Sequence, residues 1–139
     1  MDNIREITIE AKLEKVEEVL KFVNTELESR GVPFDVLQRI DLALEEIVVN
    51  ICSYAYPEGQ GIAIVAVSFP KENVIQLDIK DRGIPYDPLK KPDPDISIPL
   101  KQRKIGGLGI YMTKKSMDEI AYEYEDGYNH MTLIKYTNA

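Results

Sequence analysis

Three short groups of residues in this sequence could carry chemistry, and the first is a carboxylate and an amide four residues apart. On a helix, Glu46 and Asn50 would project from the same face. An amide oxygen is a neutral, hard ligand suited to Mg²⁺ held mainly by phosphate oxygens, and the carboxylate could polarise an attacking hydroxyl or water. The alternative is that both residues are solvated on the outer face of the helix, because this spacing is common by chance.

The second group is Asp81-Arg82-Gly83, which follows a β-branched run. At the end of a strand, an aspartate can accept a hydrogen bond from the exocyclic amine of adenine, and a glycine lets the base approach the backbone. An ordinary β-turn would use the same two residue types. The group therefore fits both recognition of a base and a simple turn.

The third group is a glycine cluster, Gly106, Gly107, Leu108 and Gly109, directly before an expected helix. Its unhindered backbone N–H groups, together with the partial positive charge of the helix N-terminus, could bind phosphate. The basic segment 101–104 precedes it in an acidic chain, which supports this interpretation. The alternative is a flexible hinge, because a glycine cluster alone is a weak signal of phosphate binding.

Hydrophobic periodicity predicts the elements that must position these groups. In chain order we expect an edge strand at 4–10, helices at 13–27 and from about 35 to just before Pro57, strands at 62–69 and 74–80, a short helix at 110–117, and strands at 119–125 and 130–136. The strands come mostly as adjacent hairpins instead of alternating with helices. This order predicts an α+β fold, with a mixed, mostly antiparallel sheet and helices on one face.

A proline-rich segment interrupts this pattern at 82–105. Its five prolines, at positions 85, 88, 92, 94 and 99, are incompatible with a continuous helix or a central strand. Loops of this length are uncommon in compact domains and are usually functional. We therefore expect the segment to form a lid over a ligand.

Composition limits the class of protein. The 139 residues fit a single domain, 1–139, and the formal net charge of -7 argues against direct binding to nucleic acid. The first residues do not resemble a signal segment and no apolar run is long enough to span a membrane, so we expect a cytoplasmic protein. With one cysteine, Cys52, and one histidine, His130, neither a disulfide nor a zinc cluster is expected.

The three groups, in this order and at this separation, resemble the N box, G1 box and G2 box of the GHKL ATPase superfamily, whose members have the Bergerat ATP-binding fold. Within that superfamily the sequence is similar to the anti-sigma-factor serine/threonine kinases. LALEEIVVNICSYAYP resembles their N-box helix, DIKDRGIPYDP their G1 segment, and GGLGIYMTKKSMDEIAYEYEDG their G2 loop, helix and next strand. The similarity covers nearly the whole chain and implies a two-layer α/β sandwich with an ATP lid.

The resemblance also implies roles for individual residues. Glu46 would be the catalytic carboxylate, Asn50 the Mg²⁺ ligand, and Asp81 the acceptor for the adenine amine. The residues expected to bind ATP or its metal are Asn50, Asp81, Gly83, Gly106, Gly107, Leu108, Gly109 and Thr132. Thr132 aligns with a family threonine near the adenine, although threonine is also an ordinary strand residue.

The resemblance implies an anti-sigma factor that sequesters a sigma factor and uses Mg²⁺-ATP to phosphorylate an anti-anti-sigma protein on serine. It further implies a homodimer. A second hypothesis is a regulatory module that binds ATP and sequesters its partner without phosphorylating it. A third is an interaction domain that binds no nucleotide.

Overall fold

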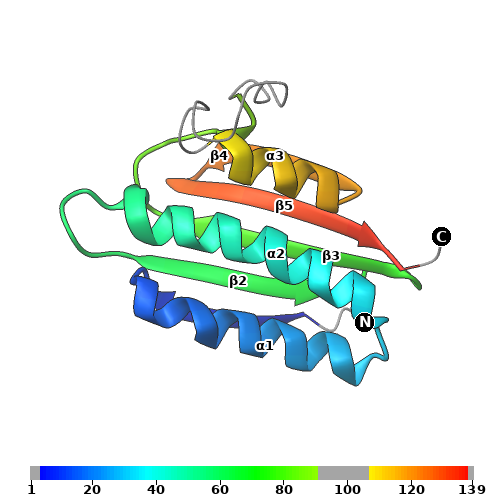
Figure 1. Ribbon diagram of the computed structural model, residues 1–139. Coiled ribbons are helices and arrows are strands. Elements are labelled where there is room, and N and C mark those ends of the chain that lie inside the picture. Colours follow the sequence, from blue (N-terminus) through cyan, green and yellow to red (C-terminus); the bar gives the residue numbers. More distant parts are fainter. Residues whose placement is uncertain (1–3, 91–106, 138–139) are drawn as a thin grey trace.

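The computed structural model describes residues 4–90 and 107–137, which form a five-stranded sheet with three helices against one face (Figure 1). The strands are β1 (Arg5–Glu10), β2 (Ile62–Ser68), β3 (Val74–Asp81), β4 (Glu119–Glu125) and β5 (Tyr128–Tyr136), in the spatial order β1-β2-β3-β5-β4. All neighbouring pairs among them are antiparallel. The expected α+β fold is present, and its sheet contains no parallel pair in the described part of the chain.

The helices are α1 (Val16–Ser29), α2 (Phe34–Asn50) and α3 (Gly107–Ser116). Shorter helical turns are the 3-10 turn Leu13–Lys15 before α1, the π-helical turn Ile51–Ala55 that continues α2, and the 3-10 turn Pro88–Lys90 after β3. Most of the predicted lid and all of Gly106 lie outside the described residues.

Alternation along the central strands builds one side of the core. In β2 the buried positions are Ala63, Val65 and Val67, and β3 and β5 repeat the pattern with Ile75, Leu77 and Ile79 and with Met131 and Leu133. Helix stripes that include Val19, Val23, Leu44 and Val48 form the other side. Each fully buried aliphatic side chain contributes about 1.5–3 kcal/mol of transfer free energy, so this contact fixes α2 on the sheet.

The chain leaves the first helix at Gly31. Its φ is 72°, in the left-handed region that favours glycine. The N–H of Gly31 donates to Glu28 O (3.0 Å) and that of Val32 donates to Leu27 O (3.2 Å), which is the Schellman pattern of helix termination. Pro33 follows immediately, and α2 begins at Phe34.

Helix α3 begins at Gly107, three residues before the predicted start at 110. Glycine is a poor helix former, by about 0.8–1 kcal/mol relative to alanine, but α3 packs against α2 and Gly109 in its first turn lies against Glu46. At the other end of α3, the buried Lys135 of β5 donates to Ser116 O (2.9 Å) and pairs with Asp118 (3.5 Å). A lysine at this place satisfies a terminal carbonyl and complements the helix dipole.

The packing of α2 predicts a contrast between two leucines of the same helix. Leu44 is 1% exposed and Leu42 is 47% exposed. Leu44→Ala should lower the free energy of unfolding by about 2–5 kcal/mol because it leaves a cavity in the core. Leu42→Ala, the matched control, should change it by about 0.5 kcal/mol or less. Urea denaturation measures both, and equal costs would contradict this placement of α2.

Candidate active site

The last two turns of α2 hold the predicted carboxylate and amide side by side. Asn50 Nδ2 donates to Glu46 Oε2 over 2.8 Å, and both side chains are half-buried. Only the NH₂ group of the amide can donate to a carboxylate, so this bond fixes the orientation of Asn50. The bond directs Nδ2 to the carboxylate and leaves Oδ1 facing elsewhere as an acceptor suited to a hard cation.

The start of α3 lies directly against this pair. A Cβ atom added to Gly109 would overlap the carboxyl group of Glu46. A side chain at position 109 would displace this carboxyl group, so glycine lets the Glu46 carboxylate lie against the first turn of α3. Gly107 and Leu108 lie in the same first turn, where the backbone N–H groups have no partner within the helix.

The turn after β3 contacts the end of the same helical segment. A Cβ atom on Gly83 would overlap the carbonyl of Ala55, the last residue of the π-helical turn, and the N–H of Ile84 donates to that carbonyl over 2.9 Å. The predicted role of Gly83 was to let a nucleotide base approach its backbone. In the structure, the backbone of the α2 continuation makes that approach.

Asp81 is the last residue of β3 and its side chain is buried. Its Oδ1 accepts from the N–H of Gly83 (2.9 Å) and from Nδ2 of Asn129 (3.0 Å). Burial raises the pKa of Asp81 above its ordinary value, and the two hydrogen bonds oppose that shift. Among the candidates, this carboxylate is the one that the protein removes from water.

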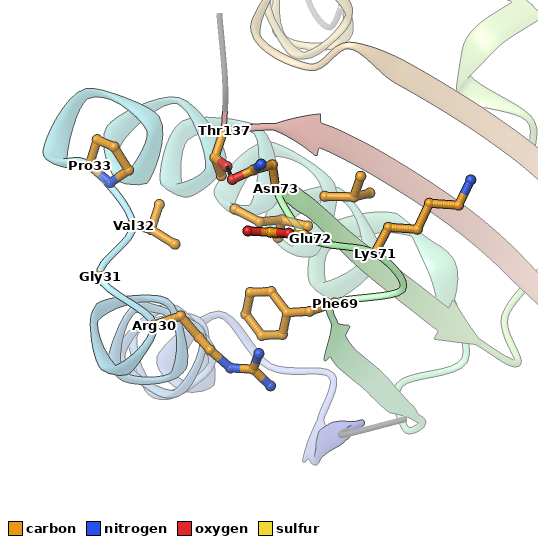
Figure 2. Close-up of a pocket in the computed structure, with 11 residues that line it drawn as sticks. Arg30, Gly31, Val32, Pro33, Phe69, Lys71, Glu72, Asn73 and Thr137 are labelled. Carbon is orange, nitrogen blue, oxygen red and sulfur yellow. Dashed lines mark hydrogen bonds between the residues drawn. The ribbon is translucent and has the colours of Figure 1, made fainter. Parts of the chain in front are cut away.

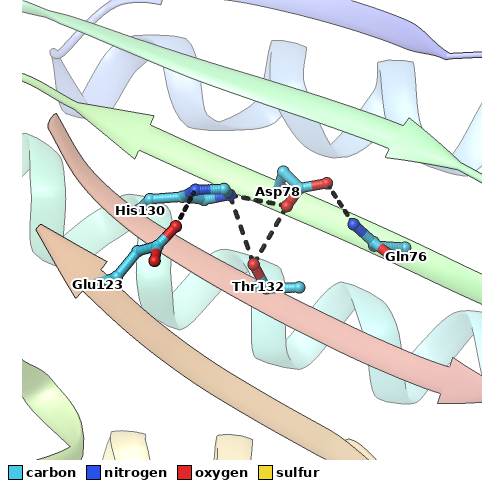
Figure 3. Close-up of polar contacts among 5 residues, drawn as sticks. All are labelled: Gln76, Asp78, Glu123, His130 and Thr132. Atoms are coloured by element: carbon cyan, nitrogen blue, oxygen red, sulfur yellow. Dashed lines mark hydrogen bonds and ion pairs between the residues drawn. The ribbon is translucent and has the colours of Figure 1, made fainter. Parts of the chain in front are cut away.

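Glu46, Asn50, Asp81, Gly83 and Gly109 are thus linked through α2 and its continuation, but Thr132 is not brought to them. Thr132 lies on the sheet face opposite the helices, where its hydroxyl donates to Asp78 Oδ1 over 3.1 Å (Figure 3). The reason is strand alternation, since Met131 and Leu133 on either side of it point into the core.

The same polar cluster contains His130, the histidine of the sequence. Figure 3 shows its ring between Asp78 of β3 and Glu123 of β4. Nε2 lies 2.7 Å from Asp78 Oδ1, and Nδ1 lies 3.6 Å from Glu123 Oε1. These contacts cross three neighbouring strands on the face away from the helices.

Sequence reasoning missed two residues that hold the site together. Asn129, buried on β5, is the partner of Asp81 in the strand register. Tyr56 follows the π-helical turn, where its hydroxyl accepts from the N–H of Arg82 (2.7 Å) and donates to Ile62 O (2.5 Å). The available signal for Asn129 was a polar residue at an inward-facing position of an alternating strand.

A cavity of about 480 Å³ lies at the other end of the sheet. Figure 2 shows its lining between the α1–α2 connection and the β2–β3 turn, with Arg30, Phe69, Asn73 and Thr137 among the residues around it. The guanidinium of Arg30 stacks 4.0 Å from the centre of the Phe69 ring. None of the predicted site residues within 4–90 and 107–137 lines this cavity, so it is separate from the group around α2.

Fold and site together have the arrangement expected of a GHKL-type ATPase. Comparison with family models agrees, because the histidine kinase-like ATPase domain model matches residues 9–135. The chain belongs to this family, which confirms the resemblance inferred from the sequence.

Several curated proteins are similar to this chain. The serine/threonine-protein kinase BtrW of Bordetella bronchiseptica is 30% identical over 98 residues, which cover 70% of this chain and 69% of BtrW. The serine-protein kinase RsbW of Bacillus thuringiensis is 31% identical over 135 residues, which cover 93% of this chain and 81% of RsbW. The match to RsbW thus spans nearly the whole chain, and the match to BtrW spans a smaller part of it.

Among solved structures, the RsbU and RsbW domains of Rv1364c from Mycobacterium tuberculosis match with a TM-score of 0.67 and 18% identity. The match covers 96% of this chain but only 32% of that longer one. It supports the fold. Within 4–90 and 107–137, no helix is both long and apolar enough to cross a membrane.

The raised pKa of Asp81 predicts how stability depends on pH. The folded state holds this proton more tightly than the unfolded state, so the stabilisation is fully present below the ordinary pKa of about 3.9 and is lost as the pH rises through the raised native pKa. Asp81→Asn has no such proton and should gain stability relative to wild type across that window. Urea denaturation between about pH 3 and 8 measures the difference, and a constant difference would contradict the prediction.

The contact between Gly109 and Glu46 predicts a non-additive pair of substitutions. Gly109→Ala should destabilise the wild type by about 0.5–1.5 kcal/mol, because the new methyl group displaces the Glu46 carboxylate and breaks its hydrogen bond with Asn50. In a Glu46→Ala background the same change should be neutral or stabilising, since alanine is the better helix former. A double-mutant cycle by urea denaturation measures this coupling. Equal effects of Gly109→Ala in both backgrounds would show that the two residues are not in contact.

Proposed function

We propose that this chain binds Mg²⁺-ATP and transfers the γ-phosphoryl group to a serine hydroxyl of a protein partner. The observation that carries the proposal is the Glu46 carboxylate, held between the amide of Asn50 and the first turn of α3 at Gly109. The similarity to proteins named as serine-protein kinases supports this reaction. We also propose that residues 1–139 act as one ATP-binding domain.

The described residues provide a suitable group for each part of the nucleotide. Asp81 offers a buried acceptor for the adenine amine, and the N-terminal turn of α3 offers N–H donors for phosphates. Asn50 Oδ1 is the proposed protein ligand for Mg²⁺. Since the described residues contain no cluster of three His, Cys, Asp or Glu side chains able to hold a metal, the phosphates would supply most of its ligands.

Bound Mg²⁺ would neutralise charge that develops on the transferring phosphoryl group. The protein's own contribution is positioning. Glu46 Oε2 is engaged by Asn50, so Oε1 is the oxygen that would accept a hydrogen bond from the serine hydroxyl and orient it. Gly109 keeps the phosphate-binding turn next to that carboxylate.

The resemblance described above supports a specific set of partners. We propose a sigma factor that the chain sequesters, an anti-anti-sigma protein that it phosphorylates, and a second copy of the chain in a homodimer. The acidic net charge of -7 supports protein partners over nucleic acid. We place this activity in the cytoplasm.

The proposal predicts opposite outcomes for two neighbouring glutamates of α2. Glu46→Gln should lower phosphoryl transfer by about 10²–10⁴-fold, because an amide cannot accept the proton, while ADP binding stays within a few-fold of wild type. Glu45→Gln is the matched control, since Glu45 is exposed on the same helix, and it should retain transfer. The assay is transfer of labelled phosphate to an anti-anti-sigma protein encoded in the same genome.

Two other results of this assay would change the conclusion. Wild type that binds ADP and the sigma factor but transfers no phosphate to any encoded partner would identify a non-catalytic ATP-binding regulator. If a large excess of Mg²⁺-ATP does not raise the melting temperature of the wild type, the proposal that the chain binds nucleotide is wrong.

A further inference from the structure

The side chain of Asn129, which was not among the predicted site residues, lies at the centre of a set of polar contacts. It is buried on the helix-facing side of β5, directly opposite Asp81 in the pairing with β3. Its Nδ2 donates to Asp81 Oδ1 over 3.0 Å and to Ile84 O over 2.9 Å, and Gly83 O lies 3.4 Å away. A single amide group therefore joins the strand carboxylate to the turn that follows it.

The carbonyl side of the same amide is also occupied. Asn129 Oδ1 accepts from the N–H of Tyr86 over 3.1 Å and from the hydroxyl of Tyr122 on β4. A rotated amide would place its oxygen against Asp81 and Ile84 O, which are both acceptors. The donors and acceptors around it thus allow only one orientation of Asn129.

This orientation determines which oxygen of Asp81 can meet a ligand. Oδ1 already accepts two hydrogen bonds, from Gly83 and Asn129, so Oδ2 is the oxygen left for a nucleotide base. Both donors favour the ionised carboxylate, which can only accept hydrogen bonds. An acceptor at this place pairs with the 6-amino group of adenine and opposes the 6-oxo group of hypoxanthine or guanine.

We propose that Asn129 is the positioning residue that sets base selection: it holds Asp81 as an oriented acceptor, so that the site takes 6-aminopurine nucleotides and rejects 6-oxopurine nucleotides. This inference rests on the proposed nucleotide site and adds a determinant of its specificity. Tyr122 acts through Asn129, because its hydroxyl holds the amide oxygen. Substitutions of Asn129 and of Tyr122 are thus both expected to weaken the preference for 6-aminopurine over 6-oxopurine nucleotides.

The test compares ADP with IDP, which carries a 6-oxo group in place of the 6-amino group, by calorimetry with Mg²⁺. Asn129→Ala should lower the ADP-to-IDP affinity ratio by about tenfold or more, because one charged hydrogen bond is lost and the acceptor is no longer oriented. Tyr122→Phe removes only the supporting hydroxyl and should lower the ratio in the same direction. Tyr124→Phe, on the same strand and 49% exposed, is the matched control and should leave the ratio unchanged.

A second measurement separates this proposal from the proposed function. In the nucleotide-free protein, loss of the Asn129 donor should raise the pKa of Asp81 further, as followed by NMR of its carboxyl group. If wild type binds neither nucleotide, the nucleotide site and its base selection both fail, whatever the pKa shows. If wild type prefers ADP and folded Asn129→Ala and Tyr122→Phe keep the same ratio, the site stands and the role of Asn129 is overturned.

Discussion

Two close approaches of backbone to the end of α2 hold the candidate site together. At Gly109 the first turn of α3 lies against the Glu46 carboxylate, and at Gly83 the turn after β3 lies against the carbonyl of Ala55. A side chain at Gly83 would overlap the backbone of Ala55, and a side chain at Gly109 would displace the Glu46 carboxylate. Helix α2 is itself packed against the sheet through its buried stripe. The same helical segment therefore positions both the first turn of α3 and the turn after β3. A site whose residues are held by packed helices and strands in this way has a more precise geometry than a site built on loops alone.

Local rules were sufficient to predict much of this arrangement. Helical spacing predicted that Glu46 and Asn50 share a face, and turn chemistry predicted a turn at Asp81 to Gly83 directly after a strand. The order of strands and helices predicted the α+β class. The start of α3 was predicted three residues late, because helix propensity excludes Gly107 and Gly109 from a helix whereas the contact with α2 retains them.

The arrangement of the proposed base-binding residues required information that local rules do not contain. Thr132 was selected by resemblance in residue type, but alternation with Met131 and Leu133 turns it to the opposite face. The same alternation points Asn129 inward. Its meeting with Asp81, however, depends on the β3–β5 register between strands distant in sequence, which neither segment determines alone. The orientation of the amide depends further on Tyr122 of β4 and on the N–H of Tyr86.

Strand β5 contributes Asn129 near one end and the buried Lys135 near the other, on the same side of the sheet. The first contacts the carboxylate of β3, and the second contacts the last turn of α3. A register slip of one residue would turn both side chains to the opposite face at once. Correct strand pairing during folding is therefore also the step that assembles the proposed nucleotide site, so a misregistered sheet would lose both its stability and the contacts of that proposed site.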